Sequence, residues 1–159
     1  MFPQWKNNKG VSIIEIIVVI AILGIALVSL LTAATFSLRL SIAIKETSIA
    51  KDLAEESMEG ARSFRDGTKW SVDGLGSLQN DVSYHLVKTG TPLQWSLVPG
   101  QENISNYVRK IVLGRVYRDI NDNISLSGSE DLNTKKVTVT VSFKGKKVEL
   151  TSYLMNYKQ

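Results

Sequence analysis

Residues 9–38 read KGVSIIEIIVVIAILGIALVSLLTAATFSL. Within this segment, Ile16 to Leu38 form a run of 23 residues without a charge. A helix needs about 20 predominantly apolar residues to cross the hydrocarbon core of a bilayer. The segment therefore predicts one membrane-spanning helix near the start of the sequence.

The charges on the two sides of this helix differ in sign. Lys6 and Lys9 precede it with no acid among the first ten residues, whereas residues 39–59 carry three basic and five acidic side chains. Basic flanks stay in the cytoplasm, so we expect the N-terminus inside and the bulk of the chain outside. A secretory signal peptide has an apolar core of only about 7–15 residues before its cleavage site. The small residues 32–34 lie too deep in the run, which disfavours that alternative.

Glu15 is the unusual residue of the apolar segment. It is the fifth residue of the stretch that begins at Val11. A carboxylate at the centre of a bilayer costs about 2.5–3.5 kcal/mol on insertion scales. Two interpretations stay open: Glu15 has a functional partner, or it lies at the headgroup boundary and is hydrated.

The sequence Lys9-Gly10-Val11-Ser12-Ile13-Ile14-Glu15, followed by the uncharged run, resembles the class III signal of type IV prepilins. In that family a short basic leader ends in glycine, cleavage follows the glycine, and glutamate occupies the fifth position of the mature chain. The resemblance implies that a prepilin peptidase cuts between Gly10 and Val11 and methylates the new amine of Val11. It also implies that Glu15 serves assembly.

Two positions depart from the family pattern. Val11 stands where the family usually has phenylalanine, and Thr32 stands where major pilins often have proline. The absence of this proline favours a minor subunit over a major one.

Beyond Arg39 the apolar residues recur with a period close to 3.6, which predicts an amphipathic continuation of the helix. The residues of this apolar stripe are Ile42, Ile49, Ala50, Leu53, Ala54, Met58, Ala61 and Phe64. Asp66 and Gly67 predict the end of the helix, with Gly67 as a left-handed cap. We therefore expect one helix from about Val11 to Arg65, apolar all round in its first half and packed on a globular domain in its second.

The rest of the chain changes to short alternating runs separated by turn residues. Four segments have the alternation of half-buried strands: 81–88, 106–118, 136–143 and 147–155. The turn Lys144-Gly145-Lys146 joins the last two into a predicted antiparallel hairpin. Residues 90–106 and 121–134 are predicted as loops.

These elements predict an α+β fold in which the helix packs on an antiparallel sheet of about four strands. The arrangement resembles the type IV pilin fold. The expected organisation has four parts: a leader at 1–10, a transmembrane and assembly helix at 11–38, an amphipathic helix at 39–67 and a β head domain at 68–159.

Composition excludes several chemistries. The chain has no cysteine, which excludes a thiolate site, and its one histidine, His85, disfavours metal-hydrolase and serine-triad schemes. A net charge of +4 is too small to indicate a nucleic-acid partner. We therefore expect no enzymatic activity and no cofactor.

Two further groups of residues have alternative interpretations. Oxygen-bearing side chains in the 119–131 loop could surround calcium, although acidic turn residues are common for their local hydrogen bonds alone. These side chains are Asp119, Asp122, Ser127, Glu130 and Asp131. Trp70 and Trp95 are interpreted as core or loop anchors, with an adhesive surface role as the alternative.

The leading functional hypothesis is a minor pilin-like structural subunit of a type IV pilus or related filament. Its expected partners are prepilin peptidase, other pilin subunits, the pilus assembly machinery and, before assembly, membrane lipid. The precursor is expected in the cytoplasmic (inner) membrane and the mature chain in an extracellular or periplasmic filament. The alternatives are a pseudopilin of a type II secretion or DNA-uptake system, a membrane-anchored binding or sensor domain, and a secreted enzyme.

Overall fold

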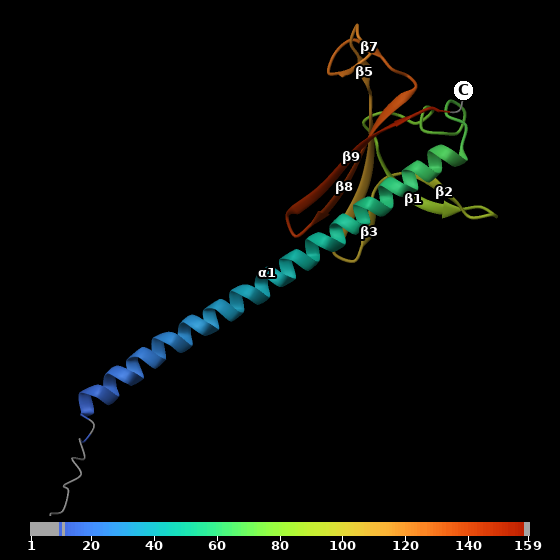
Figure 1. The fold of residues 1–159 in the computed structure, drawn as a ribbon. Coiled ribbons are helices and arrows are strands. Elements are labelled where there is room, and N and C mark those ends of the chain that lie inside the picture. Colours follow the sequence, from blue (N-terminus) through green and yellow to red (C-terminus); the bar gives the residue numbers. More distant parts are fainter. Residues whose placement is uncertain (1–9, 11, 158–159) are drawn as a thin grey trace, which may run out of the picture. The chain divides into compact units, whose positions relative to one another are not determined.

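The computed structural model describes Gly10 and residues 12–157. Its longest element is helix α1, Ile13–Gly67, with 55 residues (Figure 1). The prediction of one helix that continues from the apolar run into the amphipathic stripe is confirmed. The predicted first residue, Val11, lies outside the described residues.

The chain divides into two compact units, residues 1–45 and residues 46–159. The first unit contains the N-terminal part of α1, where every side chain from Ser12 to Ile42 is exposed. The second unit, called the head below, contains the last part of α1 and all the strands.

The head is built on a six-stranded antiparallel sheet of order β2-β1-β4-β8-β9, with β3 paired to β4. Its strands are β1 Ser83–Thr89, β2 Gln94–Pro99, β3 Glu102–Ile104, β4 Tyr107–Gly114, β8 Thr134–Phe143 and β9 Lys146–Met155. Strands β8 and β9 pair along their whole length, and the turn between them has positive φ at Lys144 (44°) and Gly145 (73°). Positive φ at both residues is typical of the two-residue turns whose twist matches that of the flanking strands. The predicted C-terminal hairpin is confirmed.

The last part of α1 lies across one face of this sheet (Figure 1). Its buried residues are Ala50, Ala54, Ser57, Met58, Gly60, Ala61 and Phe64. Opposite them, Val137, Val139 and Val141 of β8 are fully buried. At Gly60 an added Cβ would lie 2.4 Å from Cδ1 of Leu86, so glycine permits the close approach of α1 to β1.

Three details of the helix prediction are wrong. Ile42 and Ile49 are exposed, at 58% and 37%, so the buried stripe begins at Ala50. Gly67 does not adopt a left-handed conformation. Instead, the hydroxyl of Thr68 donates a hydrogen bond to the carbonyl of Phe64 at 2.6 Å and satisfies one of the carbonyls at the helix end.

The predicted loop at 90–106 contains β2 and β3, so the sheet has six strands rather than about four. Strand β2 was missed because it lies at the sheet edge, where Leu97 is its one buried residue and the apolar alternation is weak. The strand candidate 106–118 is interrupted after Gly114. It resumes as β5, which pairs with two other short strands in a second sheet of order β6-β5-β7. Their bounds are β5 Tyr117–Arg118, β6 Ile124–Ser125 and β7 Ser129–Glu130.

Candidate processing and assembly site

The N-terminal end of α1 carries the predicted processing residues. Gly10 is exposed and precedes the helix, whereas Val11, the predicted methylation position, lies outside the described residues. A Cβ added at Gly10 would meet nothing within 4 Å in the chain. The fold itself therefore does not require glycine at position 10.

Glu15 lies in the first turn of α1. Its backbone amide donates to the carbonyl of Ser12 at 3.0 Å, and the amide of Ile16 donates to the same carbonyl at 3.3 Å. A carboxylate in this turn interacts favourably with the helix dipole by about 0.3–1 kcal/mol. The carboxylate of Glu15 makes no hydrogen bond or ion pair with any residue that the structure describes. A side-chain partner for Glu15 must therefore come from the undescribed N-terminal residues or from another molecule.

In the described part of the chain, α1 is the one helix long and apolar enough to cross a membrane. None of its most apolar part is buried in the described chain. The hydroxyls in this region bond back to the helix: Ser29 to the carbonyl of Ile25 at 2.8 Å, and Thr32 to that of Val28 at 2.8 Å. Such bonds satisfy the hydroxyls within the helix itself, as apolar surroundings require.

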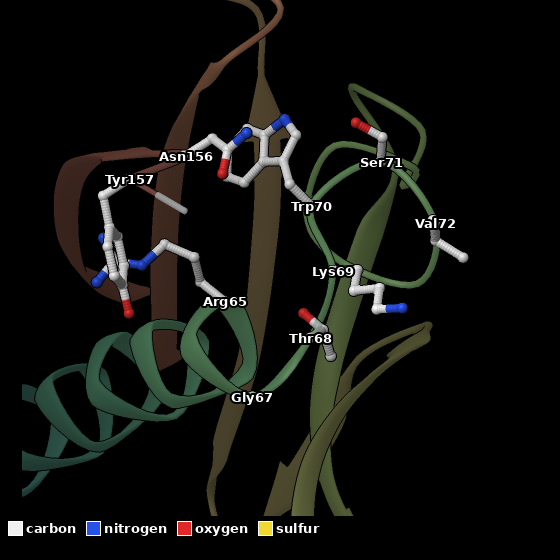
Figure 2. A pocket seen from close by; sticks show the side chains of 9 residues that line it. All are labelled: Arg65, Gly67, Thr68, Lys69, Trp70, Ser71, Val72, Asn156 and Tyr157. Atoms are coloured by element: carbon white, nitrogen blue, oxygen red, sulfur yellow. The ribbon is translucent and has the colours of Figure 1, made fainter. Parts of the chain in front are cut away.

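The head contains a pocket of about 530 Å³ beside the C-terminal end of α1 (Figure 2). The side chains in Figure 2 come from the helix end, the segment after it and the residues that follow β9: Arg65, Gly67, Thr68, Lys69, Trp70, Ser71, Val72, Asn156 and Tyr157.

Most polar groups of this pocket already have partners in the chain. The indole N–H of Trp70 donates to the carbonyl of Leu132 at 3.0 Å. The guanidinium of Arg65 lies 4.9 Å from the ring centre of Tyr157 and donates to Asp66 at 2.7 Å. The lining offers aromatic and cationic surface but no nucleophile paired with a base, so the pocket has no catalytic arrangement.

Two carboxylates of the 119–131 loop are hydrogen-bonded within the chain. The carboxylate of Asp119 accepts the backbone N–H of Asn121 at 2.8 Å and of Asn123 at 2.9 Å, and these bonds lower the pKa of Asp119. The carboxylate of Asp131 accepts Nε of Arg118 at 2.7 Å. Calcium takes about six to eight oxygens, and these contacts engage two of the four carboxylates that could supply them. Within Gly10 and residues 12–157, no group of three or more His, Asp or Glu side chains is placed to hold a metal ion.

Sequence reasoning missed a buried ionic contact in the head. Arg109 is 5% exposed, and its guanidinium donates to Glu102 at 2.6 Å and to Glu56 at 2.7 Å. The sequence contains a signal for this contact, because Arg109 lies on the same face of β4 as the buried residues Ile111 and Leu113. A charge on the buried face of a strand indicates a partner on the element packed against it.

The histidine and two of the tryptophans of the chain are part of the fold of the head. His85 lies half-buried in β1, and its Nδ1 is buried without a hydrogen-bond partner in the described chain. Trp70 belongs to the core, and Trp95 packs against it while Nζ of Lys88 lies 4.4 Å from the ring centre of Trp95. The interpretation of both tryptophans as anchors is confirmed.

Comparison with known proteins bears on the N-terminal segment. Residues 5–31 match a family model described as the prokaryotic N-terminal methylation motif. This range contains Gly10, Val11 and Glu15. The searches of curated proteins and of solved structures each gave no match to this chain. The long N-terminal helix packed on an antiparallel sheet is consistent with a type IV pilin-like α+β fold. The chain therefore carries the N-terminal methylation signal of the type IV pilin family.

Proposed function

We propose that this chain is a structural subunit of a type IV pilus or a related filament. The precursor is inserted in the inner membrane with its N-terminus in the cytoplasm. A prepilin peptidase cuts it between Gly10 and Val11 and methylates the amine of Val11. The mature chain then enters the filament through α1, beside other pilin subunits.

One observation carries this proposal: the methylation motif lies on a helix whose apolar surface nothing in the described chain covers. All side chains from Ser12 to Ile42 are exposed, and the motif match ends inside this segment. A helix that is apolar on every face must be surrounded by lipid or by other helices. Lipid fulfils this need before assembly, and the helices of other subunits fulfil it afterwards. A contact between two different surfaces that does not close on itself generates a filament.

The surroundings of Gly10 support the processing step. Because a side chain at this position would meet nothing within 4 Å, folding places no demand on its size. A strict requirement for glycine would therefore come from a second protein that holds this segment, as the peptidase does.

The processing step is tested by sequencing the mature N-terminus in a host that expresses the prepilin peptidase. We expect N-methylated Val11 in the wild type and an uncut precursor for Gly10→Leu. Gly24→Leu is the matched control, because a Cβ at Gly24 also meets nothing within 4 Å. Cleavage of Gly10→Leu at the normal rate would contradict this assignment. A retained Met1 would support a membrane-anchored binding domain, and a start beyond Ala34 would support a secreted protein.

The location of the mature chain tests the filament role. Shearing of intact cells, followed by proteomics of the released filaments, is expected to recover the processed chain. Its share of the filament mass separates a minor subunit from a major one. Recovery from the cell envelope, with none in sheared filaments, would favour a pseudopilin of a secretion or DNA-uptake system.

A further inference from the structure

Strand β9 is a long edge strand of the six-stranded sheet. It has ten residues, and its pairing with β8 continues without a bulge from Lys146 to Met155. It contains no proline, and its last five residues carry no charge. No described strand pairs with its outer side. Proteins usually protect such an edge, because its backbone groups are a ready template for another strand.

The other edge strands of the same sheet are short or contain proline. Strand β3 has only three residues. Strand β2 has six residues and ends in Pro99, and Pro92 lies in the turn before it. Proline cannot donate a backbone hydrogen bond, so it hinders the addition of a strand. Within the described chain, β9 is therefore the edge that is open to a further strand.

The hairpin turn fixes which backbone groups of β9 point outward. Phe143 and Lys146 flank a two-residue turn with positive φ at both positions, so these two residues exchange both backbone hydrogen bonds. Such pairs alternate along an antiparallel ladder, so the N–H and C=O groups of every second residue of β9 point away from β8. These residues are Lys147, Glu149, Thr151, Tyr153 and Met155, and all five are exposed.

We infer that this edge binds the same edge of a second copy of the chain, with the two β9 strands antiparallel and a twofold axis at Thr151. Thr151 then faces Thr151 of the second copy. Glu149 faces Tyr153, and in the next pair Lys147 faces Met155. This register pairs all five outward residues, whereas other registers pair fewer. It places no like charges opposite each other, and it joins two threonines at its centre, which is a favourable cross-strand pair.

The edge favours a second copy because it complements itself. Its two outward charges, Lys147 and Glu149, lie toward one end of β9, and antiparallel pairing sets them against the uncharged end of the other copy. Parallel pairing in the same register would instead bring the charges of the two copies side by side. Val148 and Leu150 are only partly buried at the border of the core, and a further strand would cover their open side.

This contact differs from the helix contact that is proposed to build the filament. It is symmetric and closes on itself, so it joins two heads, whereas the contact that repeats along a filament joins two different surfaces. The inference therefore does not depend on the proposed function.

Cysteine cross-linking tests the pairing, because the chain has no cysteine of its own. In the full-length chain purified in detergent, Thr151→Cys is expected to give a disulfide-linked dimer under a mild oxidant. The two Cα atoms of such a pair lie about 5.5 Å apart, a distance that a disulfide spans. Lys147→Cys is the matched control, because it is exposed on the same face of β9 but its two copies would lie roughly 26 Å apart. The double variant Lys147→Cys/Met155→Cys should link again.

Charge at the twofold axis gives an independent test. Thr151→Lys and Thr151→Glu each place like charges opposite each other, and each should weaken the dimer several-fold in analytical ultracentrifugation. An equal mixture of the two variants should restore association, because opposite charges then face each other. Both variants should keep the circular dichroism spectrum of the wild type, since Thr151 is exposed.

Three results would overturn the inference. The first is equal cross-linking of Thr151→Cys and Lys147→Cys, which would indicate random collision or another register. The second is association of Thr151→Lys as tight as that of the wild type. The third is a purified chain that stays monomeric; if the thiol of Thr151→Cys is then shielded from a maleimide in intact cells, the edge belongs to a strand of another protein. None of these results concerns cleavage after Gly10, so the proposed function would stand.

Discussion

The guanidinium of Arg109 in β4 lies 2.7 Å from the carboxylate of Glu56 on α1. The side chain of Arg109 is 6% exposed, whereas those of Glu56 and Glu102 are 52% and 32% exposed. The acids therefore keep much of their contact with water, and the desolvation cost falls mainly on the arginine. Since Glu102 belongs to β3, one side chain ties the helix, β3 and β4 together.

Replacing Arg109 by methionine should destabilise the head, because the ionic contacts between the helix and two strands are lost. We expect Arg109→Met to lower the free energy of unfolding by about 1–2 kcal/mol, because its hydrogen bonds are lost while the two exposed acids stay hydrated, measured by urea denaturation of a fragment that starts at Ser41. Arg62→Met is the control, because its pair with Glu59 is exposed and should change stability by less than about 1 kcal/mol. Equal losses for the two variants would show that the Arg109 contacts add nothing to stability.

The same fragment tests whether the head folds without the membrane-spanning segment. Every residue of the hydrophobic core lies between Ala50 and Leu154, so removal of residues 1–40 takes away no core side chain. We expect the fragment from Ser41 to Gln159 to be soluble and to unfold in one cooperative transition. Coincident urea curves from tryptophan fluorescence and circular dichroism would establish this. A gradual or probe-dependent transition would contradict it.

The carboxyl of Asp131 is expected to make the stability of the head depend on pH. Partial burial alone would raise the pKa of Asp131, but hydrogen bonds from Arg118, Thr134 and the amide of Asn133 outweigh this effect and lower the pKa. A carboxyl with a lowered folded pKa adds stability above its unfolded value of about 3.9 and loses it as the pH falls through the folded value.

We therefore expect the free energy of unfolding to decrease from about pH 5 downward, and to decrease less steeply for Asp131→Asn, which lacks the titrating group. Asp52→Asn is the control, because Asp52 has no partner among the described residues. Urea midpoints measured from pH 3 to pH 7 give the slopes. Identical slopes for wild type and Asp131→Asn would show that this carboxyl does not control the acid sensitivity.

Periodicity predicted the parts of the fold in which burial alternates regularly. The four alternating apolar residues of β8 are all buried, and the stripe from Ala50 to Phe64 forms the helix side of the core. The edge strand β2 and the short strand β3 lie in a segment that the sequence predicts as a loop, because hydrogen bonds to neighbouring strands, rather than their own apolar pattern, define them. A pairing of this kind depends on the partner strand and leaves little trace in the local sequence.

The features of the candidate site and the head also differ in whether the local sequence indicates them. The spacing from Gly10 to Glu15 and the uncharged run are local, so the sequence alone indicated them, and the family match at residues 5–31 covers the spacing and the run as far as Leu31. Glu56, the partner of Arg109 on the helix, lies 53 residues away in the sequence. The end of α1 depended on a hydroxyl after the helix rather than on Gly67. Both features are set by which surfaces meet in three dimensions.

The carboxylate of Glu15 has no partner in the described chain. Cleavage after Gly10 would create one cation near it, the amine of Val11, which stays protonatable after methylation. Between adjacent subunits, the amine of one copy and the carboxylate of another would form a pair that fixes the step at which a new subunit enters. The carboxylate should therefore act on assembly rather than on folding.

We expect Glu15→Leu to leave membrane insertion, cleavage after Gly10 and head stability nearly unchanged, and to lower incorporation into filaments. Glu15→Gln separates charge from polarity, because the amide keeps the shape of the side chain but cannot pair as an ion. If the ionic pair is responsible, both variants are depleted when each is co-expressed with a tagged wild-type chain and the sheared filaments are quantified. Equal incorporation of wild type and both variants would mean that Glu15 is only a hydrated residue at the membrane surface. Depletion of Glu15→Leu alone would mean that the polarity of the Glu15 side chain, rather than its charge, serves assembly.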